Sequence, residues 1–277
     1  MKQDTITKKL FEDKDIFASF INGVIYQGKN RLLGKGLKEC SLSTINENFQ
    51  ERRRDVLQAY QFQGQIFAIY HLESQSVIDF SMVFRMMEYQ AALYLKKYKE
   101  NQRHRDKLPP IVSVVFYTGK EEWKEYKSLY ECVQVSQELR EWISDYRIHV
   151  FSCAQNEIEF EDNDLNFFVW GIKYSYQDKW ENLKDKFKDK IIRKGTLKML
   201  SRMCGQKEEL KDMEEKVNVS HELGSYQRRM INLGKEEGIH EGYQQGARNT
   251  QEQIREKMRT LGYTKQQIDE ICGKDTK

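Results

Sequence analysis

The spacing of hydrophobic residues in the first third of the chain predicts a helix followed by a β-hairpin. Between Leu10 and Ile25, apolar side chains recur three and four residues apart, which places them on one face of a helix. Two apolar runs, residues 54–60 and 65–73, then flank Gly64. Two strand-like runs joined by a short glycine-containing turn indicate a hairpin that reverses near Gly64.

The longest periodic pattern follows this hairpin and predicts a helix of about 25 residues that begins near Asp79. Its apolar stripe, which we expect to face a core, consists of Phe80, Phe84, Met87, Ala91, Tyr94 and Tyr98. Arg85 and Tyr89 lie four residues apart and off this stripe. Pro109 and Pro110 end the helix, and the apolar run 111–117 is typical of a fully buried strand.

The order helix, hairpin, helix, strand predicts an α/β domain. Residues 120–205 look mainly helical, with one short strand at about 148–151. Glycine then recurs at every fourth position from Gly234 to Gly246, which leaves a bare strip along a helix and allows another helix to approach closely. We therefore expect a domain over residues 1–223 and a helical tail over 224–277 that serves oligomerisation or regulation, although a flexible, solvated tail is an alternative.

Composition narrows the class of protein but does not name a partner. The 277 residues include 15 Tyr, 14 Phe and 4 Trp, too many aromatics for a disordered chain, and the net charge is only +3. No apolar run approaches the ~20 residues that a membrane helix needs. The five cysteines form no CxxC pair. We expect a cytoplasmic protein with no membrane partner.

Three polar residues of the hairpin form a candidate site. Glu73 and Gln75 lie two apart in a strand and so project on the same face. A turn at Gly64 places position 55 opposite position 72 or 73, so Asp55 and Glu73 are expected to be neighbours. Two adjacent carboxylates suit a hard divalent cation such as Mg²⁺, with Mn²⁺ or Ca²⁺ as alternatives. The alternative is that both acids are ordinary solvated positions at strand ends.

Basic residues flank this hairpin in the sequence. Residues 84–107 hold seven basic and three acidic side chains, a local charge of +4. The candidate nucleic-acid contacts are Arg54, Arg85, Tyr89, Lys96 and Lys99. Two alternatives remain open, because Arg85 could form a salt bridge with Glu73 and a basic helix end could simply complement the helix dipole.

Several short motifs occur in an order that resembles the Rpn family of recombination-promoting nucleases and putative transposases. They are Asp55, Leu72-Glu73-Ser74-Gln75-Ser76, Met82-Val83-Phe84-Arg85 with Tyr89, and Leu108-Pro109 before the strand that ends in Phe116-Tyr117-Thr118-Gly119. The resemblance implies a PD-(D/E)XK, restriction-endonuclease-like core with a mixed central sheet flanked by helices. It also implies a metal-dependent DNA endonuclease of low sequence specificity, linked to recombination or to a mobile-element origin, with Asp55, Glu73 and Gln75 at the motif positions.

Two positions depart from the family pattern. Val83 stands where relatives tend to have proline, and Ser19 stands where they often have an acid in the first helix. The second departure leaves open a catalytically inactive DNA-binding or assembly protein that retains the nuclease fold. A nuclease that acts on RNA or on special ends is a further alternative.

Overall fold

The computed structural model describes residues 3–40, 56–100, 107–124, 126–205, 213–220 and 222–223. The chain divides into two compact units, residues 1–222 and 223–277. The second unit lies almost entirely outside the described residues, and so do the glycine repeat and the oligomerisation predicted for it. No helix in the described ranges is long and apolar enough to cross a membrane.

The N-terminal segment forms two helices, α1 (Gln3–Phe11) and α2 (Lys14–Val24), where the hydrophobic spacing predicts one. Asp13 lies at the break. Its side chain accepts hydrogen bonds from the backbone N–H groups of Asp15 at 2.9 Å and Ile16 at 3.1 Å. The first turn of a helix leaves such donors unpaired, so this cap starts a second helix in a new direction.

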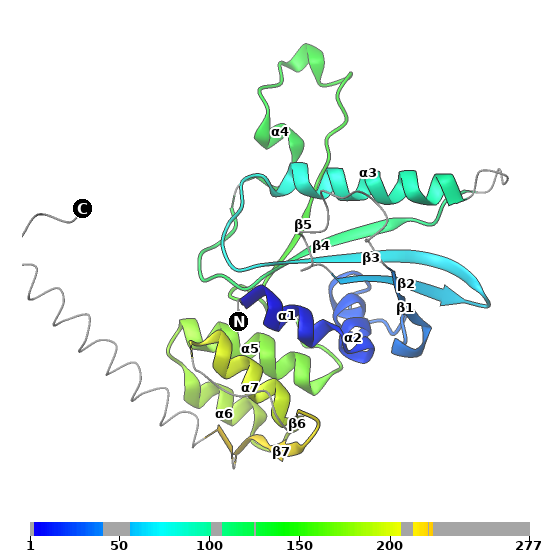
Figure 1. The fold of residues 1–277 in the computed structure, drawn as a ribbon. Helices are drawn as coiled ribbons and strands as arrows, with labels where there is room; N and C mark the ends of the chain where they lie inside the picture. The colour runs from blue at the N-terminus through cyan, green and yellow to red at the C-terminus, as the bar shows by residue number, and fades with distance from the viewer. Residues whose placement is uncertain are drawn as a thin grey trace, which may run out of the picture. The chain divides into compact units, whose positions relative to one another are not determined.

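A five-stranded mixed sheet forms the centre of the domain (Figure 1), in the order β1-β2-β3-β4-β5. The strands are β1 (Leu37–Glu39), β2 (Val56–Phe62), β3 (Gln65–Gln75), β4 (Ile111–Tyr117) and β5 (His149–Ser152). The first three strands pair antiparallel, whereas β4 pairs parallel with both β3 and β5. The predicted strand 111–117 and the short strand near residue 150 are thereby confirmed.

The predicted hairpin is confirmed as β2 and β3. Its two central residues, Gln63 and Gly64, have φ angles of 50° and 81°. Positive φ at both positions defines the two-residue turn whose twist matches that of paired strands. The last described pair at the open end of the hairpin is Val56 with Leu72.

Helix α3 (Met82–Glu100) covers one face of the sheet (Figure 1), but not with the stripe that the periodicity predicts. Its buried residues are Met82, Val83, Met86, Tyr89 and Leu93. Met87 and Tyr94 of the predicted stripe are partly buried against the core, whereas Phe80, Phe84 and Tyr98 are exposed. The helix has apolar residues on two sides, and contact with β4 selects the side that carries Met86 and Tyr89.

The opposite face of the sheet is covered by α1 and α2 and has an aromatic core. Phe20 of α2 packs edge-on against Phe11, Phe116 and Phe151, with ring centroids 5.0–5.5 Å apart across the cluster. Edge-to-face contacts of this kind add to the gain from burying large rings. This cluster joins the N-terminal helices to β4 and β5.

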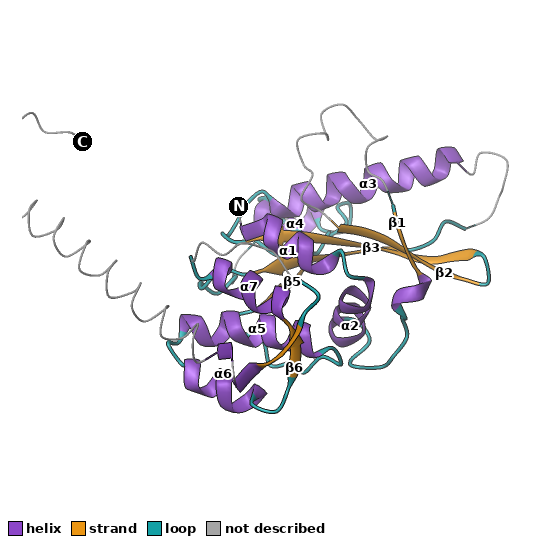
Figure 2. Cartoon of the chain, turned by 60° about the horizontal axis from the view of Figure 1, so that its bottom comes forward, coloured by secondary structure: helices purple, strands orange, loops and turns teal. Residues whose placement is uncertain are grey.

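Most of the remaining described elements are helical, and all of them except the first, which contacts α3, lie beside α1 and α2 (Figure 2). They are α4 (Leu129–Cys132), α5 (Asn163–Tyr176), α6 (Trp180–Phe187) and α7 (Lys194–Met203), with a small sheet of β6 (Ile191–Arg193) and β7 (Lys216–Asn218). The predicted helical character of residues 120–205 is therefore confirmed from α5 onward. Residues 133–148 hold little regular structure.

Candidate functional site

Glu73 lies near the carboxyl end of β3 on the face that α3 covers. It pairs across the sheet with Val115 of β4, which belongs to the apolar cluster beneath α3. The Glu73 side chain is only 2% exposed. An ionised carboxylate at this depth is costly unless hydrogen bonds and positive charge compensate for the lost water.

Two side chains supply that compensation at the same oxygen. Nε2 of Gln75 donates a hydrogen bond to Oε1 of Glu73 at 2.7 Å, and the guanidinium of Arg85 contacts the same Oε1 at 2.5 Å. The first contact follows from the two-residue repeat of a strand, and the structure places these two predicted site residues together. The second contact is the salt bridge that the sequence left as an alternative for Arg85.

Arg85 is also held by Asp79, in the segment before α3. Its guanidinium contacts Oδ2 of Asp79 at 2.6 Å, while Oδ1 accepts hydrogen bonds from the N–H and hydroxyl of Ser81. Burial acts to lower the pKa of Arg85, but the attraction of Glu73 and the hydrogen bonds with Tyr89 and Asp79 together outweigh it, so the pKa is raised. Burial raises the pKa of Asp79, and hydrogen bonds from Ser81 and Arg85 more than reverse this. The guanidinium of Arg85 therefore lies between two carboxyl groups and contacts both of them.

His71 and Tyr89 complete the cluster from below. His71 is buried on the same face as Glu73, and its ring meets that of Tyr89 edge-on at 5.3 Å between centroids. Burial lowers the pKa of His71 to about 4, despite the opposing attraction of Glu73, so His71 is neutral at neutral pH. The Tyr89 side chain hydrogen-bonds to Arg85.

The burial of Tyr89 corrects one expectation. The sequence predicts that Tyr89 contacts nucleic acid, whereas its ring is 2% exposed in the cluster beneath α3. A ring this deeply buried cannot reach a bound strand. Its position supports Arg85 from below instead.

The other predicted site residues are not gathered around Glu73. Asp55 and Arg54 lie outside the described residues. Lys96 and Lys99 belong to the last turns of α3, about 16 Å or more along the helix axis from Arg85 at ~1.5 Å per residue. Lys96 acts electrostatically on Cys40, next to β1, so this basic helix end lies at a different part of the sheet from Glu73.

Ser19, where the sequence resemblance leads us to expect an acid, does not face this cluster. It is buried in α2, and its hydroxyl accepts a hydrogen bond from the backbone N–H of Asp162 at 3.0 Å. Helix α2 packs on the Phe116 face of the sheet, and Glu73 projects from the other face. The structure thus separates Ser19 from the candidate site.

The donor atoms of the cluster decide whether a metal ion fits. Hard divalent cations bind carboxylate and other oxygens. Within the described ranges, no group of three or more His, Cys, Asp or Glu side chains is placed to hold an ion. Glu73 has suitable chemistry, although Arg85 and Gln75 already engage its Oε1. The residues fit a cation only if a second carboxylate contributes, and Asp55 is the one that the sequence offers.

Sequence reasoning missed Asp79 as part of this cluster. An aspartate two residues before a serine, just ahead of a helix, is a common turn and capping signal. That signal locates the start of α3, but it does not indicate that the other carboxylate oxygen holds Arg85. The contact depends on where the first turn of the helix lies over the sheet.

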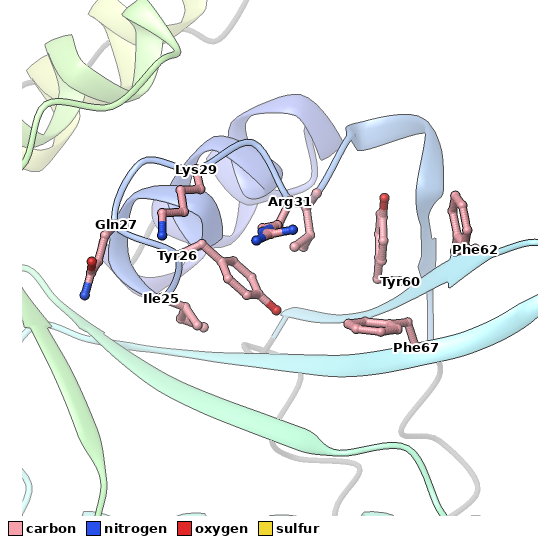
Figure 3. Close-up of a pocket in the computed structure, with 9 residues that line it drawn as sticks. Ile25, Tyr26, Gln27, Lys29, Arg31, Tyr60, Phe62 and Phe67 are labelled. Atoms are coloured by element: carbon pink, nitrogen blue, oxygen red, sulfur yellow. The ribbon is translucent and has the colours of Figure 1, made fainter.

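A pocket of about 600 Å³ opens at another part of the domain (Figure 3). It lies between the segment that follows α2 and the β2–β3 hairpin. Aromatic and basic side chains from these two segments point into it, including Tyr26, Arg31, Tyr60 and Phe67. None of these residues belongs to the Glu73 cluster.

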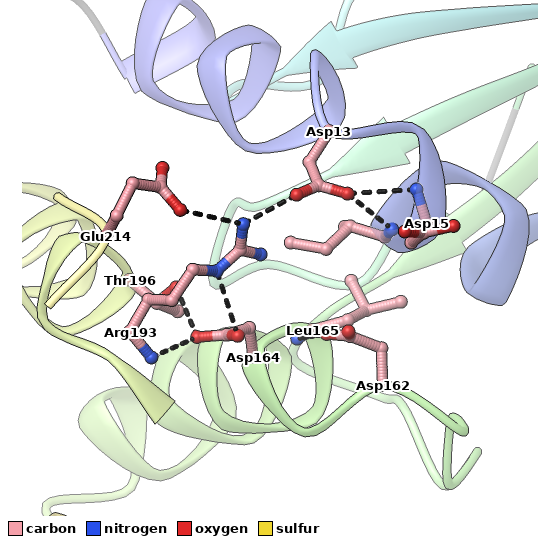
Figure 4. Close-up of polar contacts among 9 residues, drawn as sticks. Asp13, Asp15, Asp162, Asp164, Leu165, Arg193, Thr196 and Glu214 are labelled. Carbon is pink, nitrogen blue, oxygen red and sulfur yellow. Dashed lines mark hydrogen bonds and ion pairs between the residues drawn. The ribbon is translucent and has the colours of Figure 1, made fainter. Parts of the chain in front are cut away.

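A second polar cluster joins the turn between α1 and α2 to the helical part of the domain (Figure 4). The guanidinium of Arg193 contacts Asp13 at 2.5 Å and Asp164 at 3.1 Å. Thr196 donates to Asp164 at 2.6 Å. Burial acts to raise the pKa of Asp13, but hydrogen bonds from Arg193 and from the backbone N–H groups of Ile16 and Asp15 more than reverse this. Each group has a structural partner, so this cluster anchors the helices.

The fold and the buried acid–amide pair define the class of protein. A mixed five-stranded sheet flanked by helices on both faces, with Glu73 and Gln75 at the end of β3, is a restriction-endonuclease-like α/β core. The chain belongs to the family of YhgA-like putative transposases, whose family model matches residues 1–198. This match confirms the resemblance seen in the motifs. No curated protein and no solved structure matches the chain.

Proposed function

We propose that this protein is a metal-dependent DNA endonuclease of low sequence specificity, with Glu73 and Asp55 as the ligands of a divalent cation such as Mg²⁺. The proposal goes further than the transposase family itself. It is supported most by one observation, the burial of Glu73 at the end of β3 with Gln75 and Arg85 directed at it.

The energetics of this cluster favour a functional role. A buried ion pair contributes little net stability compared with apolar residues of similar size, because desolvation offsets most of the attraction. Positions where a sheet keeps a charged, hydrogen-bonded cluster inside an apolar layer are candidates for catalysis or binding. Here the carboxylate, the amide and the guanidinium come from adjacent elements, β3 and α3.

The side chains have distinct proposed roles. Gln75 fixes the orientation of the Glu73 carboxylate through its amide hydrogen, and it cannot act as a base near neutral pH. Arg85 holds Glu73 ionised and carries positive charge suited to a phosphate oxygen. A divalent cation, when bound, lowers the pKa of a coordinated water and polarises the phosphate.

A nicking assay on supercoiled plasmid DNA with Mg²⁺ tests the proposal. The full chain should relax the plasmid, and Asp55→Asn and Glu73→Gln should each reduce cleavage to background. Glu138→Gln, which alters an exposed acid far along the chain, serves as the matched control and should cleave like the wild type. Equal cleavage by all four proteins would remove the proposed site.

A second candidate is a DNA-binding or assembly protein that retains the fold without cleavage. The contact between Arg85 and Glu73 favours it, because the guanidinium already neutralises the acid without a metal. This candidate predicts salt-sensitive DNA binding in EDTA and no nicking with either Mg²⁺ or Mn²⁺. Circular dichroism of each variant keeps a loss of folding apart from a loss of activity.

A further inference from the structure

Four aromatic side chains surround the pocket between the segment after α2 and the β2–β3 hairpin (Figure 3). They are Tyr26, Tyr60, Phe62 and Phe67. Phe62 and Phe67 are 62% and 63% exposed, which is high for rings of this size in a folded domain. Exposed rings gathered in a concave site, and not scattered over the surface, indicate a binding surface.

A β-bulge accounts for the position of Phe67. Tyr60 pairs with Ala68 but the next residue, Gln61, pairs with Ile66, so β3 contains one extra residue here. Strict alternation would turn Phe67 away from Ala68 and toward the α3 face. The bulge redirects the ring to the pocket, beside Tyr60.

Positive charge faces these rings. Lys29 and Arg31 line the pocket and are exposed, and no acidic side chain is among the described residues that line it. A bound anion at the pocket would therefore meet cations and no acid in its lining.

The segment that carries the two cations is held in place by Asn22, a buried residue of α2. Its Oδ1 accepts hydrogen bonds from the N–H groups of Arg31 at 3.1 Å and Leu32 at 2.9 Å, and its Nδ2 donates to the carbonyl of Leu32 at 2.8 Å. The Tyr26 hydroxyl is 2.6 Å from that of Tyr70 in the sheet. Groups fixed in this way lose little entropy when a ligand binds.

We propose that this pocket binds single-stranded DNA, with an unpaired base stacked on Phe67 or Phe62 and the adjoining phosphate held by Arg31 and Lys29. Proteins that bind single strands combine aromatic stacking platforms with cationic grooves. A cavity of about 600 Å³ has the volume of a small-molecule site and can admit one nucleotide unit.

The pocket is a separate site from the Glu73 cluster. Phe67 precedes Glu73 by six positions on β3, which corresponds to roughly 20 Å at ~3.3 Å per residue. The pocket also opens on the sheet face that α2 covers, opposite to Glu73. The inference therefore goes beyond the proposed hydrolysis, and binding here does not require cleavage.

Fluorescence anisotropy with labelled oligothymidylate, the full chain and EDTA tests this inference without cleavage. Phe67→Ala should weaken binding about 5- to 140-fold, which corresponds to ~1–3 kcal/mol of stacking at ~1.4 kcal/mol per tenfold. Phe67→Leu, which keeps apolar bulk but removes the ring, should weaken it similarly. Arg31→Gln should weaken binding and flatten its salt dependence.

The matched control is Trp142→Ala, which removes an aromatic ring that is 84% exposed at another part of the chain and should leave binding unchanged.

Phe62→Ala provides a second test if Phe67→Ala fails to fold. Unchanged oligothymidylate binding in both phenylalanine variants, or no binding by the wild type, would overturn the proposal. Tighter binding of oligouridylate would contradict DNA as the occupant. Self-association lost in Phe67→Ala, with DNA binding unchanged, would assign the pocket to a second copy of the chain.

Discussion

Replacing Arg85 with methionine would leave Glu73 buried without the cation that contacts its Oε1 at 2.5 Å. Removing one partner of a buried ion pair costs ~3–5 kcal/mol, because the other charge stays in the interior uncompensated. The Arg85 side chain is 23% exposed, so water can reach this side of the pair and reduce the cost. We therefore expect the free energy of unfolding to fall by about 3 kcal/mol, the lower end of that range.

Urea unfolding of the wild type, Arg85→Met, Glu73→Gln and the double variant in EDTA measures this cost. Glu73→Gln should cost less than Arg85→Met, since it buries no charge and leaves Arg85 paired with Asp79. The double variant should be much closer to Glu73→Gln than to the sum of the two single variants. Additive losses, or a loss below about 1 kcal/mol for Arg85→Met, would refute the argument.

Mg²⁺ provides a second arm of the same experiment. A ligand that binds only the folded state stabilises it by about 2.7 kcal/mol at ~100 times its dissociation constant. If Glu73 is a metal ligand, Mg²⁺ should restore more stability to Arg85→Met than it adds to the wild type, because the ion replaces the missing positive charge. Adding Asp55→Asn to Arg85→Met should abolish that rescue. Rescue that persists without Asp55 would exclude Asp55 as the second ligand.

Three further predictions concern stability. His71 has a pKa of about 4 in the folded protein and an ordinary value of 6.5, so the free energy of unfolding should fall by ~3 kcal/mol between about pH 6.5 and pH 4, at ~1.36 kcal/mol per unit. In urea titrations across that window, His71→Leu should reduce the dependence of the free energy of unfolding on pH. An unchanged dependence would exclude His71 as its source. Asp13→Ala should lower the free energy of unfolding by ~1 kcal/mol more than Asp13→Asn does, because both variants lose the ion pair with Arg193 but only asparagine keeps the cap of α2. Equal thermal unfolding temperatures for the two variants would contradict this. Phe20→Ala should lower the free energy of unfolding in urea by ~3–5 kcal/mol, because it leaves a cavity at the centre of the aromatic core. A loss below ~1 kcal/mol would contradict the central position of Phe20 in that core.

The parts of the fold that depend on neighbouring residues could be predicted from the sequence. Gly64 and the alternating runs around it indicate the hairpin, and the apolar run at 111–117 indicates β4. The Glu73–Gln75 contact also follows from local geometry, because residues two apart in a strand share a face. The break at Asp13 shows the limit, since a continuous apolar spacing concealed the cap.

The buried face of α3 could not be predicted in this way. Both the stripe containing Phe84 and the stripe containing Met86 satisfy helical spacing, and only packing against β4 distinguishes them. The choice has consequences for the site, because it buries Tyr89 and turns Arg85 toward Glu73. The redirection of Phe67 into the pocket likewise depends on a bulge that alternation does not reveal.

By itself, the amino-acid sequence determined strands β2 to β5, the hairpin turn, the family motifs and the shared face of Glu73 and Gln75, because each depends on residues close together in the chain. The tertiary structure alone decided that Glu73 meets Arg85, that Ser19 lies on the opposite face, and that Phe67 joins Arg31 in a pocket. These contacts arise from how layers pack, and packing is set by the fit between side chains distant in sequence.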